Sequence, residues 1–247
     1  IPITNDSWHW EVNVNMSYNK NKIIKLIRNK DPNYVGVLTG GISGGTGSTI
    51  QIHSEGHSSN AFYVYHQVYD ENGKPLEGVY VDLNGDGIIN QLDLYRYKSP
   101  APKWLAGFSS YLKYKNWDLN IAGRFSFGNY VYNNVQSNGA LYSRMYDNTG
   151  FYSNIPTAVS KTNFREAQYF SDYYVQNASF MKLDNITLGY NFQKLWKNRI
   201  DLRVFAIMQN VFTITRYKGL DPERFNGIDN NVYPRPRTFL VGVNLGF

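Results

Sequence analysis

Residues Arg237–Phe247 read RTFLVGVNLGF and show a clear two-residue alternation. Every second position is apolar, and these positions are Phe239, Val241, Val243, Leu245 and Phe247. The residues between them are mostly small or polar. Side chains of an extended strand point alternately to its two faces, so this period places the whole apolar set on one face. The stretch therefore predicts a strand with one fully apolar face and an aromatic residue at its end.

A strand of this kind fits two architectures. It can be the closing strand of a bacterial outer-membrane β-barrel, where lipid-facing and lumen-facing residues alternate. It can equally be an edge strand of a soluble β-sandwich. The stretch alone does not separate these interpretations, so the rest of the chain has to decide between them.

The composition favours an all-β chain. Its 247 residues fit one all-β domain, and 16% of them are aromatic, with 21 Tyr and 21 Gly, which suits strands and turns. No apolar run reaches the length of a transmembrane helix. The mean hydropathy of −0.46 is compatible with a membrane barrel, because each barrel strand averages an apolar and a polar face.

Other classes of protein are disfavoured by charge and residue type. The net charge of +6 comes from scattered residues and no nucleic-acid motif is present, so no nucleic-acid partner is expected. The absence of Cys excludes disulfides, zinc-thiolate sites and cysteine nucleophiles. The chain starts at Ile1 without Met or a signal peptide, so we expect a processed or trimmed chain or a piece of a longer one.

The same alternation predicts further strands. In Trp8–Tyr18, bulky apolar residues alternate with polar ones, and an aromatic residue stands at each end. Lys103–Tyr114 and Trp117–Phe127 form a hairpin around a two-residue turn, Lys115-Asn116. Additional strands are expected at Thr46–His53, Ala61–Tyr69, Phe180–Phe192 and Arg199–Phe212, and a short helix near Thr162–Tyr169. The prediction is seven or eight strands in all.

Loop lengths favour the barrel over the sandwich. From the hairpin onward, short turns alternate with long connections, as in outer-membrane barrels with short periplasmic turns and long outer loops. If the C-terminus lies at the periplasmic end, three connections lie outside the cell, namely residues 70–102, 128–176 and 213–236.

One connection carries a sharp chemical motif. Residues Asp82–Asp93 read DLNGDGIINQLD, the spacing of a calcium-binding loop. The expected ligands are Asp82, Asn84, Asp86, the carbonyl of Ile88, Asn90 and Asp93. Such a loop surrounds one Ca²⁺ with six to eight oxygens, and Ile89 is expected to point inward as an anchor. The alternative is an Asn/Asp/Gly-rich turn without metal, and in either case the role would be structural.

The sequence shows no set of residues in the spacing of a known catalytic site. The four His lack metal-ligand spacing, and neither a nucleophile elbow nor a phosphate-binding loop is present, so an enzyme is not expected. Tyrosines of the long loop could be stacking platforms for a sugar or peptide, or could pack the loop against its neighbours; those proposed as substrate contacts are Tyr130, Tyr132, Tyr146 and Tyr152.

Four motifs in order resemble the C-terminal part of SusC/RagA-type TonB-dependent transporters of the Bacteroidota outer membrane. They are WHWEVNVNMSYNKNKI, YVDLNGDGIINQLD, SDYYVQNASFMKLDNITLGYNF and FAIMQNVFTITRYKGLDPE, at residues 8–23, 80–93, 171–192 and 205–223. The resemblance covers nearly the whole chain, residues 1–247. It implies an antiparallel transmembrane β-barrel of about 22 strands, of which this chain supplies C-terminal strands.

The resemblance also implies partners and a function. The family has an N-terminal plug, a TonB-contacting segment and a SusD-like surface lipoprotein, and the plug and TonB segment are absent from this sequence. Strand edges cannot face lipid unpaired, so the chain is expected to pair with the rest of the barrel. The expected function is import of a nutrient oligomer, a glycan or peptide, across the outer membrane. The rivals are a self-contained eight-strand barrel and a secreted, calcium-stabilised, carbohydrate-binding sandwich.

Overall fold

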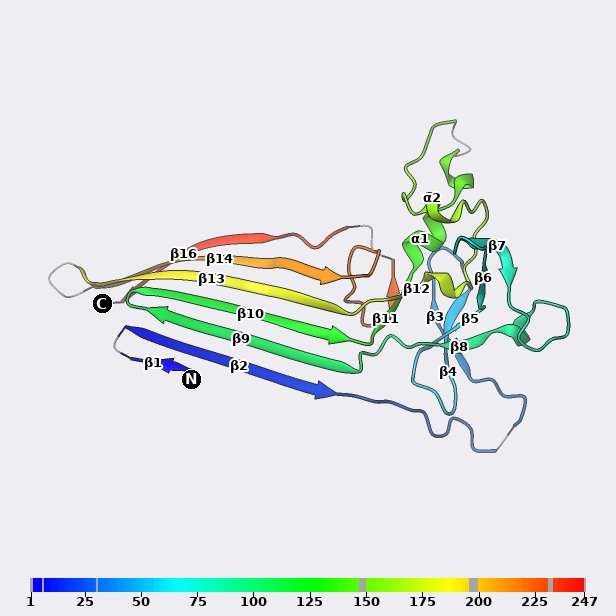
Figure 1. Ribbon diagram of the computed structural model, residues 1–247, viewed down its shortest axis with the longest axis horizontal. Coiled ribbons are helices and arrows are strands. Elements are labelled where there is room, and N and C mark those ends of the chain that lie inside the picture. Colours follow the sequence, from blue (N-terminus) through cyan, green and yellow to red (C-terminus); the bar gives the residue numbers. More distant parts are fainter. Residues whose placement is uncertain are drawn as a thin grey trace.

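The computed structural model describes residues 2–5, 7–29, 31–146, 150–195, 200–230 and 233–246. They form two bodies joined end to end (Figure 1). One is a long, twisted antiparallel sheet, which we call the wall. The other is the loop domain, built from the connections between β2 and β9, between β10 and β13, and between β14 and β16.

The wall is a seven-stranded sheet whose neighbouring strands are all antiparallel. Its strands, in spatial order, are β1 (Ile3–Thr4), β2 (Trp8–Tyr18), β9 (Trp104–Tyr114), β10 (Trp117–Phe127), β13 (Phe180–Lys194), β14 (Ile200–Thr215) and β16 (Thr238–Gly246). The order follows the chain, so the wall is a meander with β1 at one edge and β16 at the other. Short turns lie at one end of the strands and the loop domain lies at the opposite end (Figure 1).

The loop domain contains three small sheets. Their strands are β3 (Val37–Gly41), β4 (Thr49–His53), β5 (Ala61–Val64) and β8 (Tyr95–Tyr97); β12 (Val175–Asn177), β11 (Tyr130–Asn133) and β15 (Ile228–Asp229); and β6 (Gln67–Tyr69) and β7 (Pro75–Tyr80). The helices are α1 (Asn134–Gly139), α2 (Val159–Thr162), η1 (Gln91–Asp93), η2 (Tyr142–Met145) and η3 (Asp172–Tyr174). None of the helices in the described ranges is long and apolar enough to cross a membrane.

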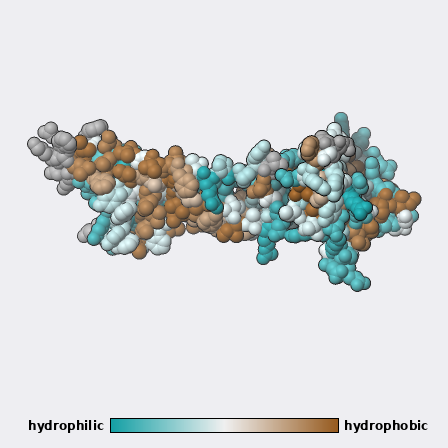
Figure 2. All heavy atoms as spheres, turned by 90° about the horizontal axis from the view of Figure 1, so that it is seen from above, coloured by the Kyte–Doolittle hydropathy of each residue, from teal (hydrophilic) through white to brown (hydrophobic). Residues whose placement is uncertain are grey.

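The main hydrophobic core of the described residues lies in the loop domain rather than in the wall. All three long connections contribute to it, through residues that include Ile50, Phe62, Val64, Tyr132, Leu141, Phe164, Tyr174 and Ile228. The wall, in contrast, leaves many large apolar side chains exposed, and hydrophobic residues gather over it in Figure 2. Val14 is 72% and Val241 is 80% exposed. The long connections are therefore one packed body, and the apolar surface of the wall is left uncovered.

The strands of the wall form close to their predicted limits. β2 and β10 have the predicted limits, and β13 continues past Phe192 to Lys194. Phe247, Arg199 and part of the expected turn at 193–198 lie outside the described residues.

Three predictions for the loop domain are wrong in detail. The expected strand at Ala61–Tyr69 is divided into β5 and β6, because Asp172 accepts hydrogen bonds at its break, from Nδ1 of His66 and the backbone N–H of Gln67. The helix expected near Thr162–Tyr169 forms earlier, as α2, and ends at Thr162, where the C-cap residue Asn163 has a left-handed φ of 58°. No strand is expected between Tyr18 and Thr46, yet β3 forms there.

Candidate functional site

The two faces of the wall differ in chemistry because the strand register aligns like residues across it. One row across the apolar face reads Trp8, Tyr114, Trp117, Tyr190, Val204 and Val243. The next row reads Trp10, Leu112, Leu119, Leu188, Ala206 and Val241. A third contains Val12, Ser110, Ile121, Ile186, Met208 and Phe239, where the Ser110 hydroxyl accepts the indole N–H of Trp10 at 2.9 Å. The apolar face is thus continuous from strand to strand.

Aromatic side chains border this face at both ends. At the short-turn end the ring centroids of Trp8 and Tyr114 are 4.2 Å apart, and at the loop-domain end those of Tyr18 and Trp104 are 4.6 Å apart. Along the 11-residue β2 the two rows are separated by about 33 Å at about 3.3 Å per residue. A strand tilted by about 40° therefore places them about 25 Å apart along the membrane normal, the height of the apolar band of outer-membrane barrels.

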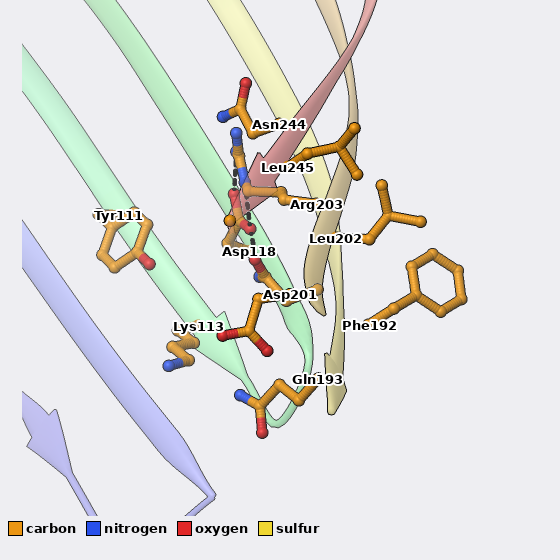
Figure 3. A pocket seen from close by; sticks show the side chains of 12 residues that line it. Tyr111, Lys113, Asp118, Phe192, Gln193, Asp201, Leu202, Arg203, Asn244 and Leu245 are labelled. Carbon is orange, nitrogen blue, oxygen red and sulfur yellow. Dashed lines mark hydrogen bonds and ion pairs between the residues drawn. The ribbon is translucent and has the colours of Figure 1, made fainter. Parts of the chain in front are cut away.

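The opposite, polar face of the wall holds a charged cluster near the short-turn end (Figure 3). Asp118 of β10 is nearly buried and accepts two hydrogen bonds from the guanidinium of Arg203 on β14, at 3.0 Å from Nε and 2.5 Å from Nη2. Asn191 of β13 donates to the same carboxylate at 2.9 Å. The cluster lies in a hollow of about 580 Å³ that also receives Lys113 and Asp201. Figure 3 shows Phe192, Leu202 and Leu245 pointing away from it, toward the apolar face.

Gly189 makes room for this ion pair. It lies opposite Asp118 in the sheet, between β10 and β14. A Cβ atom at this position would lie 2.6 Å from Oδ1 of Asp118 and 2.7 Å from Nη2 of Arg203. The glycine of the NITLGY motif is therefore required by the close approach of two side chains rather than by a turn.

A second hollow, of about 830 Å³, lies at the loop-domain end of the polar face. Here the connection after β14 folds back onto the wall, and Glu223 contacts Arg124, Lys182 and Arg235 at 2.8, 3.4 and 3.2 Å. Arg124 also pairs with Asp184, and Arg235 pairs with Asp221. These contacts fix the DPE segment of the fourth motif over the polar face.

Buried acidic residues hold the loop domain together. Asp172, at the start of the third motif, accepts hydrogen bonds from the Tyr95 hydroxyl at 2.6 Å and from His66 at 2.8 Å. Asp229 is fully buried and pairs with Arg224 and with the Tyr217 hydroxyl, which donates at 2.8 Å. Burial and the Asp229 carboxylate raise the pKa of Tyr217, so this phenol remains a hydrogen-bond donor.

The Asp/Asn loop forms an ordered set of turns. Asp82 accepts from the backbone N–H groups of Gly85 and Gly87, each at 2.7 Å, and Asp93 accepts from those of Leu83 and Asn90. The other expected ligands take part as well: Asn84 accepts from the Asp86 N–H, Asp86 from the Ile88 N–H, and Asn90 from the Leu92 N–H.

A Ca²⁺ ion at this loop would need six to eight oxygen ligands. Within the described residues no group of three or more His, Cys, Asp and Glu is placed to hold a metal ion. A cation here would depend on amide and carbonyl oxygens together with the carboxylates. Ile89 is 41% exposed and does not point inward, which corrects the expectation that it anchors the loop.

The four candidate tyrosines occupy different environments. Tyr132 is fully buried and its hydroxyl donates to the carbonyl of Tyr169 at 2.7 Å, so it packs the core. Tyr130 is half-buried. Tyr146 and Tyr152 are 68% and 77% exposed, with ring centroids 5.3 Å apart. The structure thus brings together only this last pair on an accessible surface.

Several residues of the polar face were not anticipated. The sequence does not identify Asp118, Arg203 and Glu223 as ion-pair partners, because the pairing of charged side chains across strands depends on the strand register. A usable signal was present, since Asp118, Arg124 and Arg203 occupy polar positions within otherwise apolar-alternating strands.

These features define a class of protein. A meandering antiparallel sheet, with an uncovered apolar face bordered by aromatic rows and an ion-paired face behind it, is a segment of a membrane-spanning β-barrel wall. The loop domain closes one end of that segment.

Comparison with known proteins agrees with this class. No family model matches the chain. Over its whole length it is 44% identical to "TonB-dependent receptor SusC" of Bacteroides thetaiotaomicron, of which it covers 25%. It is 31% identical to "TonB-dependent receptor P3" of Formosa agariphila, of which it covers 27%.

Solved structures share the fold. The chain superposes on one chain of the "RagAB peptide transporter" with a TM-score of 0.74 at 24% identity, covering 99% of this chain and 28% of that one. For the "RagAB peptide importer in the 'open-open' state" the TM-score is 0.67. These matches confirm the resemblance to SusC/RagA-type TonB-dependent receptors, and the chain spans about a quarter of the length of the curated relatives it matches. The names of these relatives describe receptors and transporters rather than enzymes.

Proposed function

We propose that this chain forms part of the wall and of the outer loops of a TonB-dependent transporter in the outer membrane of a Gram-negative bacterium. The observation that carries the proposal is the opposite chemistry of the two wall faces, with aromatic rows at both ends of the apolar one. Lipid covers the apolar face, and the polar face borders the lumen and the plug. The rest of the barrel pairs with the edge strands β1 and β16.

The rivals fit these observations less well. A sandwich would cover the apolar face with a second layer, yet Val14 and Val241 are largely exposed. A self-contained barrel would join its first and last strands, yet the described strands follow an open order from β1 to β16. Membrane insertion as part of a larger barrel accounts for both findings.

The transported solute in this proposal is a nutrient oligomer, a glycan or a peptide, captured with a SusD-like surface lipoprotein and imported with energy from TonB. The similarity to SusC and to the RagAB transporter supports this assignment. The loop domain, at the outer ends of the strands, is the surface that meets solute and lipoprotein.

Growth of the source bacterium tests the proposal. The gene for the complete receptor is deleted, and growth is measured on glycan oligomers and on peptides as sole carbon sources, with the gene restored as control. We expect growth on one of the two substrate classes to fail in the deletion strain, and to fail equally in a strain lacking TonB. Unimpaired growth on both classes, or growth that needs the receptor but not TonB, would contradict the proposal.

We extend the proposed function to a contact between the solute and the exposed pair Tyr146 and Tyr152. Two adjacent, accessible rings offer the stacking surface that a sugar or peptide side chain can use. Replacing both with Ala should weaken solute binding to the receptor by about tenfold, since aromatic contacts contribute about 0.5–1.5 kcal/mol each. The matched control is Tyr69→Ala, at another partly exposed position. Equal affinities in both variants would remove the pair from the binding site.

Ca²⁺ binding by Asp82–Asp93 is a further part of the proposal. The spacing of acidic and amide residues supports it, and the role is to brace a long connection. The melting temperature of the receptor is measured with Ca²⁺, with Mg²⁺ and with a chelator. We expect Ca²⁺ to raise it in the wild type and in Glu71→Gln but not in Asp82→Asn. An unchanged melting temperature in the wild type would contradict Ca²⁺ binding. The segment would then be a turn that hydrogen bonds alone stabilise.

A further inference from the structure

A cationic hollow lies where the wall meets the loop domain. Its volume is about 340 Å³, and four basic residues from two segments of the chain line it, with no Asp or Glu in its lining. Those side chains are Lys20, Arg96, Lys98 and Lys103. We call it the basic hollow; it is distinct from the ion-paired hollows of the polar face.

Its position is set by the wall. The backbone N–H of Lys103 donates to the carbonyl of Phe127 at 2.9 Å, and that of Asn19 donates to the carbonyl of Lys103 at 2.9 Å. The strand ladder therefore continues one residue beyond the aromatic pair of Tyr18 and Trp104. Since such aromatic rows mark the membrane interface, the hollow lies at the level of the lipid headgroups.

Two of its cations are held in place by neutral partners. Lys98 adopts a left-handed φ of 32°, and its ammonium lies 5.3 and 5.4 Å from the ring centroids of Tyr97 and Tyr130. The guanidinium of Arg96 donates to the carbonyl of Val35 at 2.7 Å and lies 5.1 Å from the Tyr63 ring. Aromatic faces and carbonyls orient these charges without neutralising them.

The lack of counter-ions sets this hollow apart. In the described part of the chain, none of its four basic residues forms an ion pair, whereas Arg124, Lys182, Arg203, Arg224 and Arg235 all do. Two acidic residues, Glu55 and Asp31, line a neighbouring hollow that shares Arg96. Burial, followed by the charges of Arg96 and Lys22, lowers the pKa of His57 at the rim.

We propose that the basic hollow binds a phosphate-bearing anion at the outer rim of the barrel. Four cations around a few hundred cubic ångströms match the size and charge of one or two phosphate groups, which lysine and arginine bind through charge-assisted hydrogen bonds. Two sources supply this chemistry: the phosphorylated headgroup of an outer-leaflet lipid, or a phosphate group free in solution.

The experiment uses the complete receptor purified in neutral detergent. Binding of pyrophosphate is measured by titration calorimetry, and binding of lipid A, with its dephosphorylated form as reference, is measured by native mass spectrometry. The test variant is Lys98→Gln with Lys103→Gln, which removes two charges and leaves polar side chains that are one atom shorter. Lys161→Gln, an exposed position of α2, is the control.

We expect affinity for the phosphate-bearing probe to fall about tenfold or more in the double variant and to stay at the wild-type value in the control. Binding of lipid A alone identifies the headgroup as the ligand, and binding of pyrophosphate alone identifies a soluble phosphate. No binding of either probe by the wild type, or equal binding by the wild type and the double variant, overturns the proposal. Because the readout is binding in detergent, it is independent of transport and of the proposed solute.

Discussion

The carboxylate of Glu223 lies 2.8 Å from Nη1 of Arg124 and thereby joins the last long connection to the polar face of β10. The same carboxylate is the ion-pair partner of Lys182 on β13, whose side chain is only 5% exposed. A charge at that depth is costly when it has no partner. One acidic side chain of the DPE segment therefore links two wall strands to the loop domain.

Replacing Glu223 with Gln should loosen this link. The side chain keeps its shape but loses the charge shared by three cations, so the free energy of local opening should fall by about 1–3 kcal/mol. Hydrogen exchange of residues 216–230 in the complete receptor measures it, with Glu71→Gln as control. Unchanged protection of this segment would show that its core contacts alone hold it.

Gly189→Ala should disturb the Asp118–Arg203 pair. The added methyl group would lie within 2.7 Å of both side chains, so one of them has to move. We expect the free energy of unfolding of the receptor to fall by about 1–3 kcal/mol, the contribution of charge-assisted hydrogen bonds. Gly41→Ala, where a Cβ meets no atom within 4 Å, should be close to neutral. Comparable unfolding midpoints for the two variants in urea would refute the steric explanation.

A charge introduced on one face or the other of β10 distinguishes the face that contacts lipid from the face that borders the lumen. Ile121→Lys points into the apolar face near mid-height and should lower barrel stability by about 2–4 kcal/mol. Asn120→Lys, one residue earlier, points to the polar face and should have little effect. Folding into bilayers, followed by the electrophoretic shift between folded and unfolded barrel, measures both. Similar losses in the two variants would mean that the apolar face does not contact lipid.

The loop at Asp82–Asp93 should open at low pH. Hydrogen bonds from the backbone N–H of Asn90, and also of Leu83 and Asn84, lower the pKa of Asp93 below its usual 3.8. The stabilisation is therefore complete above about pH 4 and is lost as the pH falls through the lowered pKa. Exchange rates of the Leu83 and Asn90 amides, corrected for intrinsic pH dependence, should rise below that point. In Asp93→Asn the same amides should show no such transition; a transition in both proteins would assign it to another group.

The strands of the wall could be predicted because each strand depends on residues that are close together in the sequence. Alternation at Trp8–Tyr18 and Trp117–Phe127 fixes which side chains share a face, and the Lys115-Asn116 turn fixes how two strands meet. From the hairpin onward, the alternation of short turns and long connections predicted the order of neighbouring strands.

The loop domain was predictable only in part. Its strands are two to six residues long, too short for a clear period, and their limits depend on buried partners distant in sequence. Asp172 interrupts the predicted strand at Ala61–Tyr69 from more than a hundred positions away, and no local pattern announces that contact.

The order of residues sets the two-residue alternation and thereby the strands and their faces, because side-chain direction along a strand follows from the backbone. Four sequence motifs carry the resemblance to a transporter family. The tertiary structure decided which polar residues meet. Register across three strands brings Asp118 against Arg203 around Gly189, and folding of the last connection brings Glu223 to Lys182. It also left the cations of the basic hollow without carboxylates, since pairing of charges depends on distances that the linear order of residues does not contain.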